Sequence, residues 1–416
     1  MTKNKYLFPF IMITSLFFMW GFVHNLDPIL IPHLKRSFSL STLEASLVDS
    51  AVFIAYFVMA LPAGFIMKKY GYKTGIILGL ALFAIGSFLF IPAANTQAYV
   101  FFLGALFIIA CGLTILETAA NPYASLLGPP ETATFRLNFA QSFNGLAAMT
   151  APIIGAKIIL IEGISDADLN KMTASAREFA LASEASSVKT PYLVLGSIIL
   201  VIAIIFVFLK LPEIVETEEA GDKATDHTLV DALKHKHLRW AALAQFFYVG
   251  AQVCVFSFFI LYATKVAEIS QQEAAGYAGI GMGLAFLIGR VLGTFLMKFI
   301  KAERLLAIYS VASMVLCIAA IVSHGTVALF AVIGIAFFMS IMFPTIFSLG
   351  IKDLGKDTKF GSSLIIMSIV GGAVLPPVMG YITDLSDIQV GYIVPFLCFA
   401  VVFLFGITGH KVVKRA

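Results

Sequence analysis

Residues 105–127 read ALFIIACGLTILETAANPYASLL, an apolar run that carries one carboxyl group, Glu117, near its middle. About 20 apolar residues are enough to cross a bilayer as a helix. An acidic side chain at that depth is costly, and such residues usually face a cavity or a partner. The run therefore predicts a membrane helix and makes Glu117 a candidate functional residue.

The composition of the whole chain also indicates a membrane protein. Of its 416 residues, 60% are hydrophobic and only 12% are charged, about half the charged share of soluble domains. The net charge of +4 falls in short clusters with no basic stripe, so we expect no nucleic-acid partner. The four cysteines lie inside apolar runs without metal or redox spacing, and we interpret them as small buried side chains.

Hydropathy predicts an all-α membrane protein of twelve transmembrane helices. The expected spans lie near 7–31, 44–67, 74–94, 98–126, 134–161, 190–211, 240–264, 273–297, 304–323, 327–350, 361–383 and 389–409. The hydrophilic stretch between the sixth and seventh spans suggests two fused six-helix bundles. We therefore expect an N-terminal bundle over 1–211, a cytoplasmic linker over 212–239 and a C-terminal bundle over 240–416.

The basic residues predict the orientation. If both termini are cytoplasmic, most of the 28 Lys and Arg fall on the cytoplasmic side, as the positive-inside rule requires. A multi-pass membrane protein with both termini in the cytoplasm is expected. Lys68, Lys69 and Lys73 lie in a cytoplasmic turn between the second and third spans. Arg290, inside a span, is expected to pair there with a carboxylate or a helix end.

Three acids are candidates for ion coupling. Glu117 lies in span 4, Asp27 precedes Pro28 in span 1, and Asp49 lies near the start of span 2. A carboxyl group in an apolar cavity can exchange a proton near neutral pH, whereas several oxygen ligands together could bind sodium. Asp27 could instead lie at the outer mouth, and Asp49 could simply cap its helix, so proton and sodium coupling both stay open.

Amide side chains recur along the spans that we expect to line a cavity. Amides both donate and accept hydrogen bonds, which suits a hydroxyl-rich ligand, although they also join helices to one another in membranes. The aromatic residue among those of span 7 could stack on a sugar ring. The expected substrate-binding residues are Asn25, Asn121, Asn138, Gln141, Asn144, Gln245, Tyr248 and Gln252.

Several enzyme motifs are missing from the sequence. Gly279, Gly281 and Gly283 form GxGxG inside a span without a preceding strand, so a dinucleotide loop is not indicated. We interpret these glycines, with Gly289 and Gly293, as a close helix-packing face. Because no Walker A sequence, nucleophile–base pair or HExxH is present, neither an enzyme nor a cofactor is expected.

Four stretches give the chain a specific resemblance: LETAANPYASLLGP at 116–129, FRLNFAQSFNGLAA at 135–148, WAALAQFFYVGAQ at 240–252 and MFPTIFSLGIKDLGKDTKFGSS at 342–363. In these stretches, and over essentially its whole length, it resembles the fucose:proton symporter family of the major facilitator superfamily, which includes bacterial glucose/galactose transporters. The resemblance implies the major facilitator fold in a bacterial cytoplasmic (inner) membrane, with two six-helix bundles around a cavity that opens alternately to each side. The turn that carries Lys68, Lys69 and Lys73 would then close the inner gate.

The resemblance also implies residue roles. The family's span-4 acid falls on Glu117, which would link ion binding to sugar binding, and its span-5 amides fall on Gln141 and Asn144. Fucose members carry Asn-Asp before an Ile-Leu pair where this chain has Asp27-Pro28, and an amide where it has Asp49. Because these departures add acids to spans 1 and 2, sodium is also a candidate coupling ion, with Asp27, Asp49 and Glu117 as possible ligands.

The expected function is cation-coupled import of a hexose such as glucose, galactose or fucose, by a protein for which a monomer suffices. The alternative on the same fold is an uncoupled facilitator or exporter of another small solute.

Overall fold

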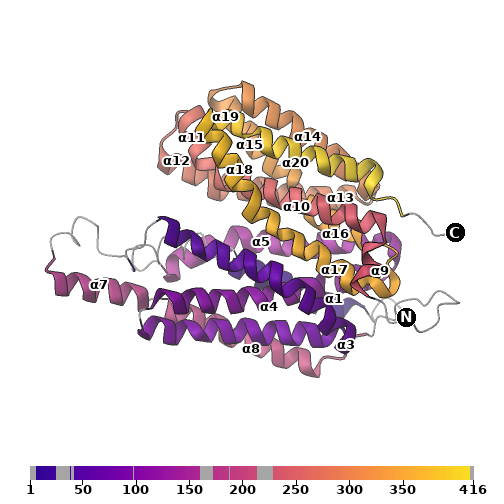
Figure 1. The fold of residues 1–416 in the computed structure, drawn as a ribbon, viewed down its shortest axis with the longest axis horizontal. Helices are drawn as coiled ribbons and strands as arrows, with labels where there is room; N and C mark the ends of the chain where they lie inside the picture. Colours follow the sequence, from indigo (N-terminus) through magenta and orange to yellow (C-terminus); the bar gives the residue numbers. More distant parts are fainter. Residues whose placement is uncertain are drawn as a thin grey trace.

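The computed structural model describes residues 6–24, 38, 42–96, 98–159, 172–186, 188–212 and 228–412. Within these ranges the secondary structure is helical, without a strand (Figure 1). The first half contains α1 (Leu7–His24), α3 (Thr42–Thr96), α4 (Tyr99–Leu126), η1 (Pro130–Thr132), α5 (Ala133–Ile159), α7 (Ala174–Ser186) and α8 (Lys189–Phe208). The second half contains α9 (Leu229–Leu233), α10 (Lys236–Ser257), α11 (Phe259–Val266), α12 (Gln271–Gly276), η2 (Tyr277–Met282), α13 (Gly283–Leu296), α14 (Ala302–Val322), α15 (Gly325–Met339), α16 (Met342–Gly350), η3 (Gly355–Asp357), α17 (Thr358–Met367), η4 (Ser368–Val370), α18 (Gly371–Leu385), α19 (Ile388–Gly391), α20 (Ile393–Leu404) and η5 (Phe405–Gly409).

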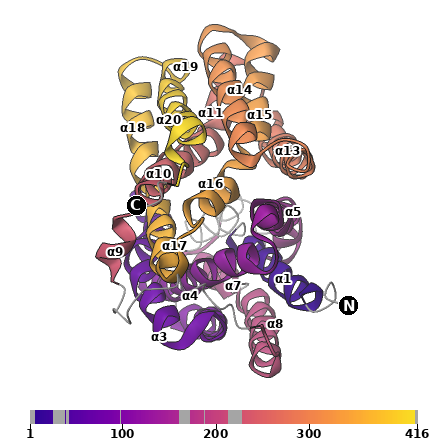
Figure 2. The same ribbon diagram turned by 90° about the vertical axis from the view of Figure 1, so that its right-hand side faces the viewer.

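The helices form two groups that follow the two halves of the chain. Figure 2 shows α1, α3, α4, α5 and α8 in one group and α10, α11, α13–α15 and α18–α20 in the other, with α16 and α17 between them. Nine helices in the described part of the chain are long and apolar enough to cross a membrane. The prediction of an all-α, twelve-helix membrane protein is confirmed, whereas the domain bounds at 211 and 240 stay a prediction.

A glycine divides the long helix α3 into two segments, which explains why α3 covers two predicted spans. The 55 residues of α3 are interrupted at Gly71, where φ is 81° and ψ is 169°. An L side chain rarely adopts such a positive φ, but glycine does so without steric cost. The chain therefore turns at Gly71, and the segments before and after it match the second and third expected spans.

The midpoint linker is more ordered than expected at its end. Within 212–239 the chain forms α9, and α10 already begins at Lys236 rather than at 240. Nε2 of His235 lies 2.9 Å from Oδ2 of Asp357, and Nε2 of His237 lies 2.9 Å from the carbonyl oxygen of Lys352. These two contacts tie the start of α10 to the turn that leads into α17.

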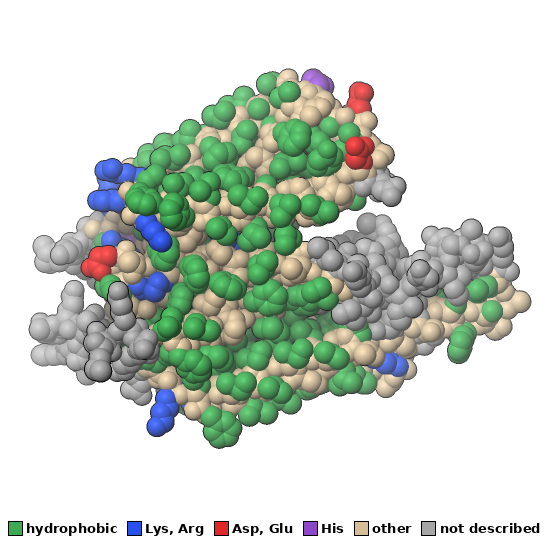
Figure 3. Space-filling model, turned by 180° about the vertical axis from the view of Figure 1, so that it is seen from behind, with side chains coloured by type: hydrophobic (Ala, Val, Ile, Leu, Met, Phe, Trp, Pro, Cys, Tyr) green, Lys and Arg blue, Asp and Glu red, His purple; other side chains and the backbone are tan. Residues whose placement is uncertain are grey.

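The outer surface matches a lipid environment. Large apolar side chains are exposed along α8 and α13, among them Phe208 at 80% and Ile288 at 55%, and Figure 3 shows apolar side chains covering the flank while Lys and Arg gather at one end. We call this end, which carries the turns around Lys68, Lys298 and Lys359, the basic end. Contiguous exposed apolar surface of this extent indicates contact with membrane.

The glycine pattern in the eighth span behaves differently from the expectation. A Cβ atom added at Gly279 or Gly283 would have nothing within 4 Å, whereas one at Gly289 would lie 2.1 Å from the carbonyl oxygen of Phe337. The segment Tyr277–Met282 is π-helical. The close packing face therefore includes Gly289 and Gly293 but not Gly279 and Gly283, so the expectation of one continuous glycine face was wrong.

Candidate coupling and substrate site

Close packing of α3 on α4 positions the central carboxyl group. A Cβ atom at Gly112 would lie 2.6 Å from the carbonyl oxygen of Gly79, and one at Gly86 would lie 2.9 Å from that of Ala105. The two helix backbones can approach this closely only because glycines line the contact. At the basic end, the guanidinium of Arg136 donates to the carbonyl oxygens of Ala124 and Ser125, which satisfies the end of α4.

Glu117 is buried inside the first helix group, and one described side chain bonds it. Its side chain is 9% exposed, and the hydroxyl of Tyr56, from α3, donates to Oε1 at 2.6 Å. Nine residues separate Glu117 from the C-terminal end of α4 at Leu126, which is about 13 Å along a helix axis. The carboxyl group thus lies well inside the bundle, where a permanent charge would be expensive.

An amide pair lies one turn further along α4. The Nε2 atom of Gln141 donates to Oδ1 of Asn121 at 3.2 Å, and both side chains are at most 5% exposed. Nδ2 of Asn121 has no hydrogen-bond partner among the described residues. Because an unpaired buried donor costs free energy, this amide is suited to bind a ligand oxygen.

The second helix group contributes a further unpartnered amide. Gln245 on α10 is completely buried, and neither its Oε1 nor its Nε2 finds a partner in the described part of the chain. The same holds for the hydroxyl of Tyr248, one turn further along α10. Gln252, a further turn along, and Asn144 on α5 are half-buried.

Several contacts join the two halves towards the basic end. We call this set the gate seam, and it includes the contacts of Arg290, Lys68 and Asn138 described below. Oγ of Ser362 on α17 donates to the carbonyl oxygen of Thr118 at 2.7 Å, next to Glu117. The hydroxyls of Thr134 and Ser348 lie 2.8 Å apart, and Phe360 packs edge-on against Phe65 with 5.0 Å between ring centroids.

Arg290 belongs to the gate seam and is 3% exposed. Its Nε donates to the carbonyl oxygen of Ser340 at 2.7 Å, and its Nη1 donates to the carbonyl oxygen of Gln141 at 2.8 Å. Ser340 is the C-terminal cap of α15. Arg290 was expected to pair with a carboxylate or a helix end, and the described partner is a helix end. The hydrogen bond from Arg290 to the backbone of Gln141 crosses between the halves, and the side chain of Gln141 bonds Asn121, one turn from Glu117.

The three lysines expected at the gate differ in their contacts. The Nζ atom of Lys68 lies 5.7 Å from the ring centroid of Phe360, across the halves. Lys69 stacks over the ring of Tyr70, and Lys73 donates to the carbonyl oxygen of Val207 at 2.8 Å, both within the first half. Only Lys68 of the three therefore has a described contact across the seam.

Asn138 also contacts the seam rather than an open site. Its Nδ2 donates to Oγ1 of Thr345 on α16 at 3.2 Å, while its Oδ1 has no partner among the described residues. Three sequence candidates cannot be placed: Asn25 and Asp27 lie outside the described residues, and Asp49 lies in α3 with its side chain outside them.

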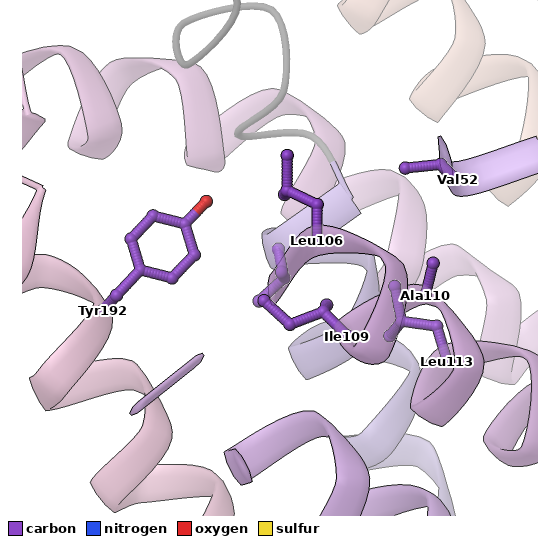
Figure 4. A pocket seen from close by; sticks show the side chains of 7 residues that line it. Val52, Leu106, Ile109, Ala110, Leu113 and Tyr192 are labelled. Atoms are coloured by element: carbon purple, nitrogen blue, oxygen red, sulfur yellow. The ribbon is translucent and has the colours of Figure 1, made fainter. Parts of the chain in front are cut away.

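A small hollow lies beside α4, on the side of Glu117 that faces the start of the helix. Figure 4 shows Leu106, Ile109, Ala110 and Leu113 along α4, with the ring of Tyr192 opposite. Its volume of about 10 Å³ is what a single water molecule needs. The lining is apolar apart from one hydroxyl, so this hollow does not suit a hexose.

A profile of the Major Facilitator Superfamily matches residues 10–369. The chain belongs to the major facilitator superfamily. Within it, the L-fucose-proton symporter of Escherichia coli is 42% identical over 409 residues, covering 97% of this chain and 93% of that protein. The glucose/galactose transporter of Brucella abortus is 40% identical over 412 residues, covering 99% and 96%. The resemblance to the fucose:proton symporter family is therefore confirmed, and these relatives are transporters rather than enzymes.

A solved structure of this superfamily has the same fold as the chain. The crystal structure of the major facilitator superfamily transporter FucP in the outward conformation superimposes with a TM-score of 0.90, at 41% identity, covering 97% of this chain and 99% of that one. The major facilitator fold predicted from the sequence is thus confirmed.

Several residues of this region carry no signal in the sequence. Tyr56 is one aromatic residue among many in the run AVFIAYFVMAL at 51–61, and nothing in the run singles out its hydroxyl. Ser362 and Thr345 likewise sit among small or apolar residues. Their partners come from helices distant in sequence, so only the packed structure identifies them.

A methyl group at Gly21 is expected to weaken sugar binding. The added Cβ would lie 2.6 Å from Nδ2 of Asn144 and 2.8 Å from its Cγ, so the amide must move. We expect Gly21→Ala to lower sugar affinity about tenfold, the effect of losing one good hydrogen bond, in equilibrium binding to purified protein. Gly104→Ala, where an added Cβ meets nothing within 4 Å, is the control. An additive effect with Asn144→Ala would contradict this explanation.

Proposed function

We propose that this chain is a cation-coupled monosaccharide symporter that imports a hexose by alternating access. The observation that carries the proposal is the buried Glu117 carboxyl group, bonded to Tyr56 and lying one turn from the amide pair Asn121–Gln141. A carboxyl group that can change charge and amides that can bind hydroxyls are what such coupling needs. The names of the relatives, an L-fucose-proton symporter and a glucose/galactose transporter, support the same function.

The coupling ion that we propose is the proton, carried by Glu117. A single carboxyl group with a neutral hydroxyl partner suffices to bind a proton, whereas sodium prefers several oxygen ligands. Sodium bound by Glu117 with Asp27 and Asp49 remains the alternative, which uptake under separately imposed pH and sodium gradients distinguishes.

The sugar subsite that we propose includes Asn121, Gln141 and Asn144 from the first half and Gln245, Tyr248 and Gln252 from the second. The unpartnered amide atoms of Asn121 and Gln245 support this, because a hexose offers hydroxyls that donate and accept. Asn25 stays a proposed contact from sequence alone. We reassign Asn138 to the gate seam because its amide bonds Thr345 across the halves.

The basic end is proposed to be cytoplasmic, with both termini there and with the protein acting as a monomer in a bacterial inner membrane. The excess of Lys and Arg at this end supports the orientation. The gate seam closes this end through Ser362, Arg290 and Lys68, which corresponds to an outward-facing state. Cation and sugar would bias the same two-state equilibrium, so each changes the affinity for the other.

Hexose uptake into proteoliposomes tests the proposed function. Purified protein is reconstituted, and saturable uptake of radiolabelled glucose, galactose and fucose is measured with the pH outside held one unit below that inside. We expect at least one hexose to accumulate above its outside concentration. Equilibration without accumulation under a pH gradient and also under a sodium gradient would favour an uncoupled facilitator, and absence of saturable hexose uptake would contradict sugar transport.

Conservative replacement of Arg290 should open the gate seam. Lysine cannot reproduce the two guanidinium donors that bond Ser340 and Gln141, because its charge and its donors are all on one nitrogen atom. Losing a charge-assisted hydrogen bond costs about 1.5–3 kcal/mol, so Arg290→Lys should raise the alkylation rate of a Thr345→Cys probe about tenfold or more. Arg304→Lys, at an exposed position, serves as the matched control. Equal alkylation in both variants would contradict the gate role.

A further inference from the structure

Tyr56 is the one described side chain that holds the Glu117 carboxyl group. It lies on α3, is 3% exposed, and its hydroxyl donates to Oε1 of Glu117 at 2.6 Å. The two residues are 61 positions apart in sequence. Their contact therefore depends on how the segment of α3 before Gly71 packs against α4.

The geometry of this contact favours one charge state of the carboxyl group. The hydroxyl of Tyr56 is the donor and Oε1 of Glu117 is the acceptor, at 2.6 Å. A donor aimed at a carboxylate stabilises its charged form relative to its neutral form. Burial in the bundle acts in the opposite sense, because the charged form loses its hydration.

The other described charges on the helices around α4 lie at the basic end and have other contacts. On α3 these are Lys68 over Phe360, Lys69 over Tyr70 and Lys73 at Val207. Arg136 on α5 bonds carbonyl oxygens at the end of α4, and Lys359 on α17 stacks over Tyr72. Among the described residues no Lys, Arg or His forms an ion pair with Glu117, so the phenol is the described group that opposes the effect of burial.

We propose that Tyr56 is a positioning residue that enables Glu117 to release its proton within the physiological pH range. This rests on the proposed function, in which Glu117 carries the coupling proton. The phenol keeps its own proton throughout: it donates to the carboxylate once the coupling proton has left and thereby stabilises the empty carrier. Without it, burial keeps the carboxyl group protonated, and the return of the empty carrier becomes slow.

Tyr56→Phe tests this role because it removes the hydroxyl and keeps the ring. The protonation of Glu117 is followed directly by infrared spectroscopy of the carboxylic acid C=O band during a pH titration, and loss of the band in Glu117→Gln assigns it. We expect the midpoint of the band to move up by about one pH unit or more in Tyr56→Phe, the size expected for one hydrogen bond to a charged group.

Transport supplies a second readout. Net uphill uptake needs proton release, whereas exchange of labelled for unlabelled sugar does not. Tyr56→Phe should therefore slow uphill uptake about tenfold at neutral inside pH, with exchange nearly unchanged and with activity returning as the inside pH is raised. A purely packing role for the ring would leave the infrared midpoint in place and would affect both modes equally.

Tyr262→Phe is the matched control. This tyrosine is completely buried in the second half, and its hydroxyl donates to the carbonyl oxygen of Ala320 at 2.6 Å. Its removal should leave the infrared midpoint and the ratio of uptake to exchange unchanged. An unshifted midpoint in Tyr56→Phe overturns the proposal. Absence of proton-driven uptake in the wild type would instead contradict the proposed function, while the infrared titration still decides the role of Tyr56.

Discussion

Glu117→Gln is expected to abolish uphill sugar accumulation and to leave sugar exchange active. Glutamine has nearly the shape of a protonated glutamic acid, and its Oε1 can still accept from the hydroxyl of Tyr56, which bonds Glu117 at 2.6 Å. The variant therefore resembles the carrier with its proton permanently bound, which can bind sugar and change conformation but cannot release a proton. A gradient of one pH unit is equivalent to about 1.4 kcal/mol, or tenfold accumulation, and this ratio should fall to about one.

The control for this variant is a carboxyl group outside the site. Glu273, in the first turn of α12, is exposed, and Glu273→Gln should accumulate sugar like the wild type. Both proteins are compared in proteoliposomes of the same lipid composition, by uptake under a pH gradient and by exchange at equal sugar concentrations. Tenfold accumulation by Glu117→Gln, with unchanged dependence on pH, would show that Glu117 does not couple transport to protons.

Gly64→Ala should shift the protein towards opening at the basic end. An added Cβ would lie 2.3 Å from Oγ of Ser363 and 3.3 Å from the ring of Phe360, both on α17 in the other half. Forcing an extra methyl into a packed contact costs about 1–3 kcal/mol, which corresponds to a shift of roughly 5- to 150-fold in the equilibrium. The closed gate seam bears this cost and the open one does not.

Spin labels across the basic end measure this shift. Tyr70 and Phe299 are 57% and 74% exposed, and cysteines at these positions report the distance between the two halves. Gly64→Ala should increase the population at the longer distance, and uphill transport should fall as the cycle becomes unbalanced. Ser363→Gly in the same chain should restore the original distribution, because it removes Oγ of Ser363 and also its Cβ, which would lie 3.2 Å from the added methyl group. If Gly64→Ala gave the same distance distribution as Gly104→Ala, the added methyl group would not destabilise the closed gate seam, and the explanation would be contradicted.

The fold could be predicted from the sequence because its main determinants are local. Apolar runs of about 20 residues define membrane helices without knowledge of their neighbours, and the carboxyl group of Glu117 stands out in such a run. The turn at Gly71, which interrupts α3, falls between the second and third spans that hydropathy predicts. The glycine pattern at Gly279–Gly283 was misleading, because spacing alone does not reveal which side of a helix faces a neighbour.

The candidate site was only partly predictable because its contacts join distant segments. Asn121 follows Glu117 by four residues, so their shared helix face could be predicted, whereas the hydrogen bond between Gln141 and Asn121 joins two spans and was not predicted. The contacts of Tyr56 with Glu117 and of Ser362 with Thr118 depend on how helices from different parts of the chain pack. Asn138 belongs to the expected amide stripe, yet its amide reaches Thr345 at the gate seam.

Sugar uptake driven by separately imposed ion gradients tests the central claim, that Glu117 couples transport to protons. Proteoliposomes containing the wild type or Glu117→Gln are given a pH gradient at equal sodium, or a sodium gradient at equal pH, with the membrane potential clamped. The account predicts that the pH gradient alone drives accumulation by the wild type, and that Glu117→Gln accumulates nothing under either condition. Accumulation driven by sodium at equal pH, with no response to the pH gradient, would contradict it.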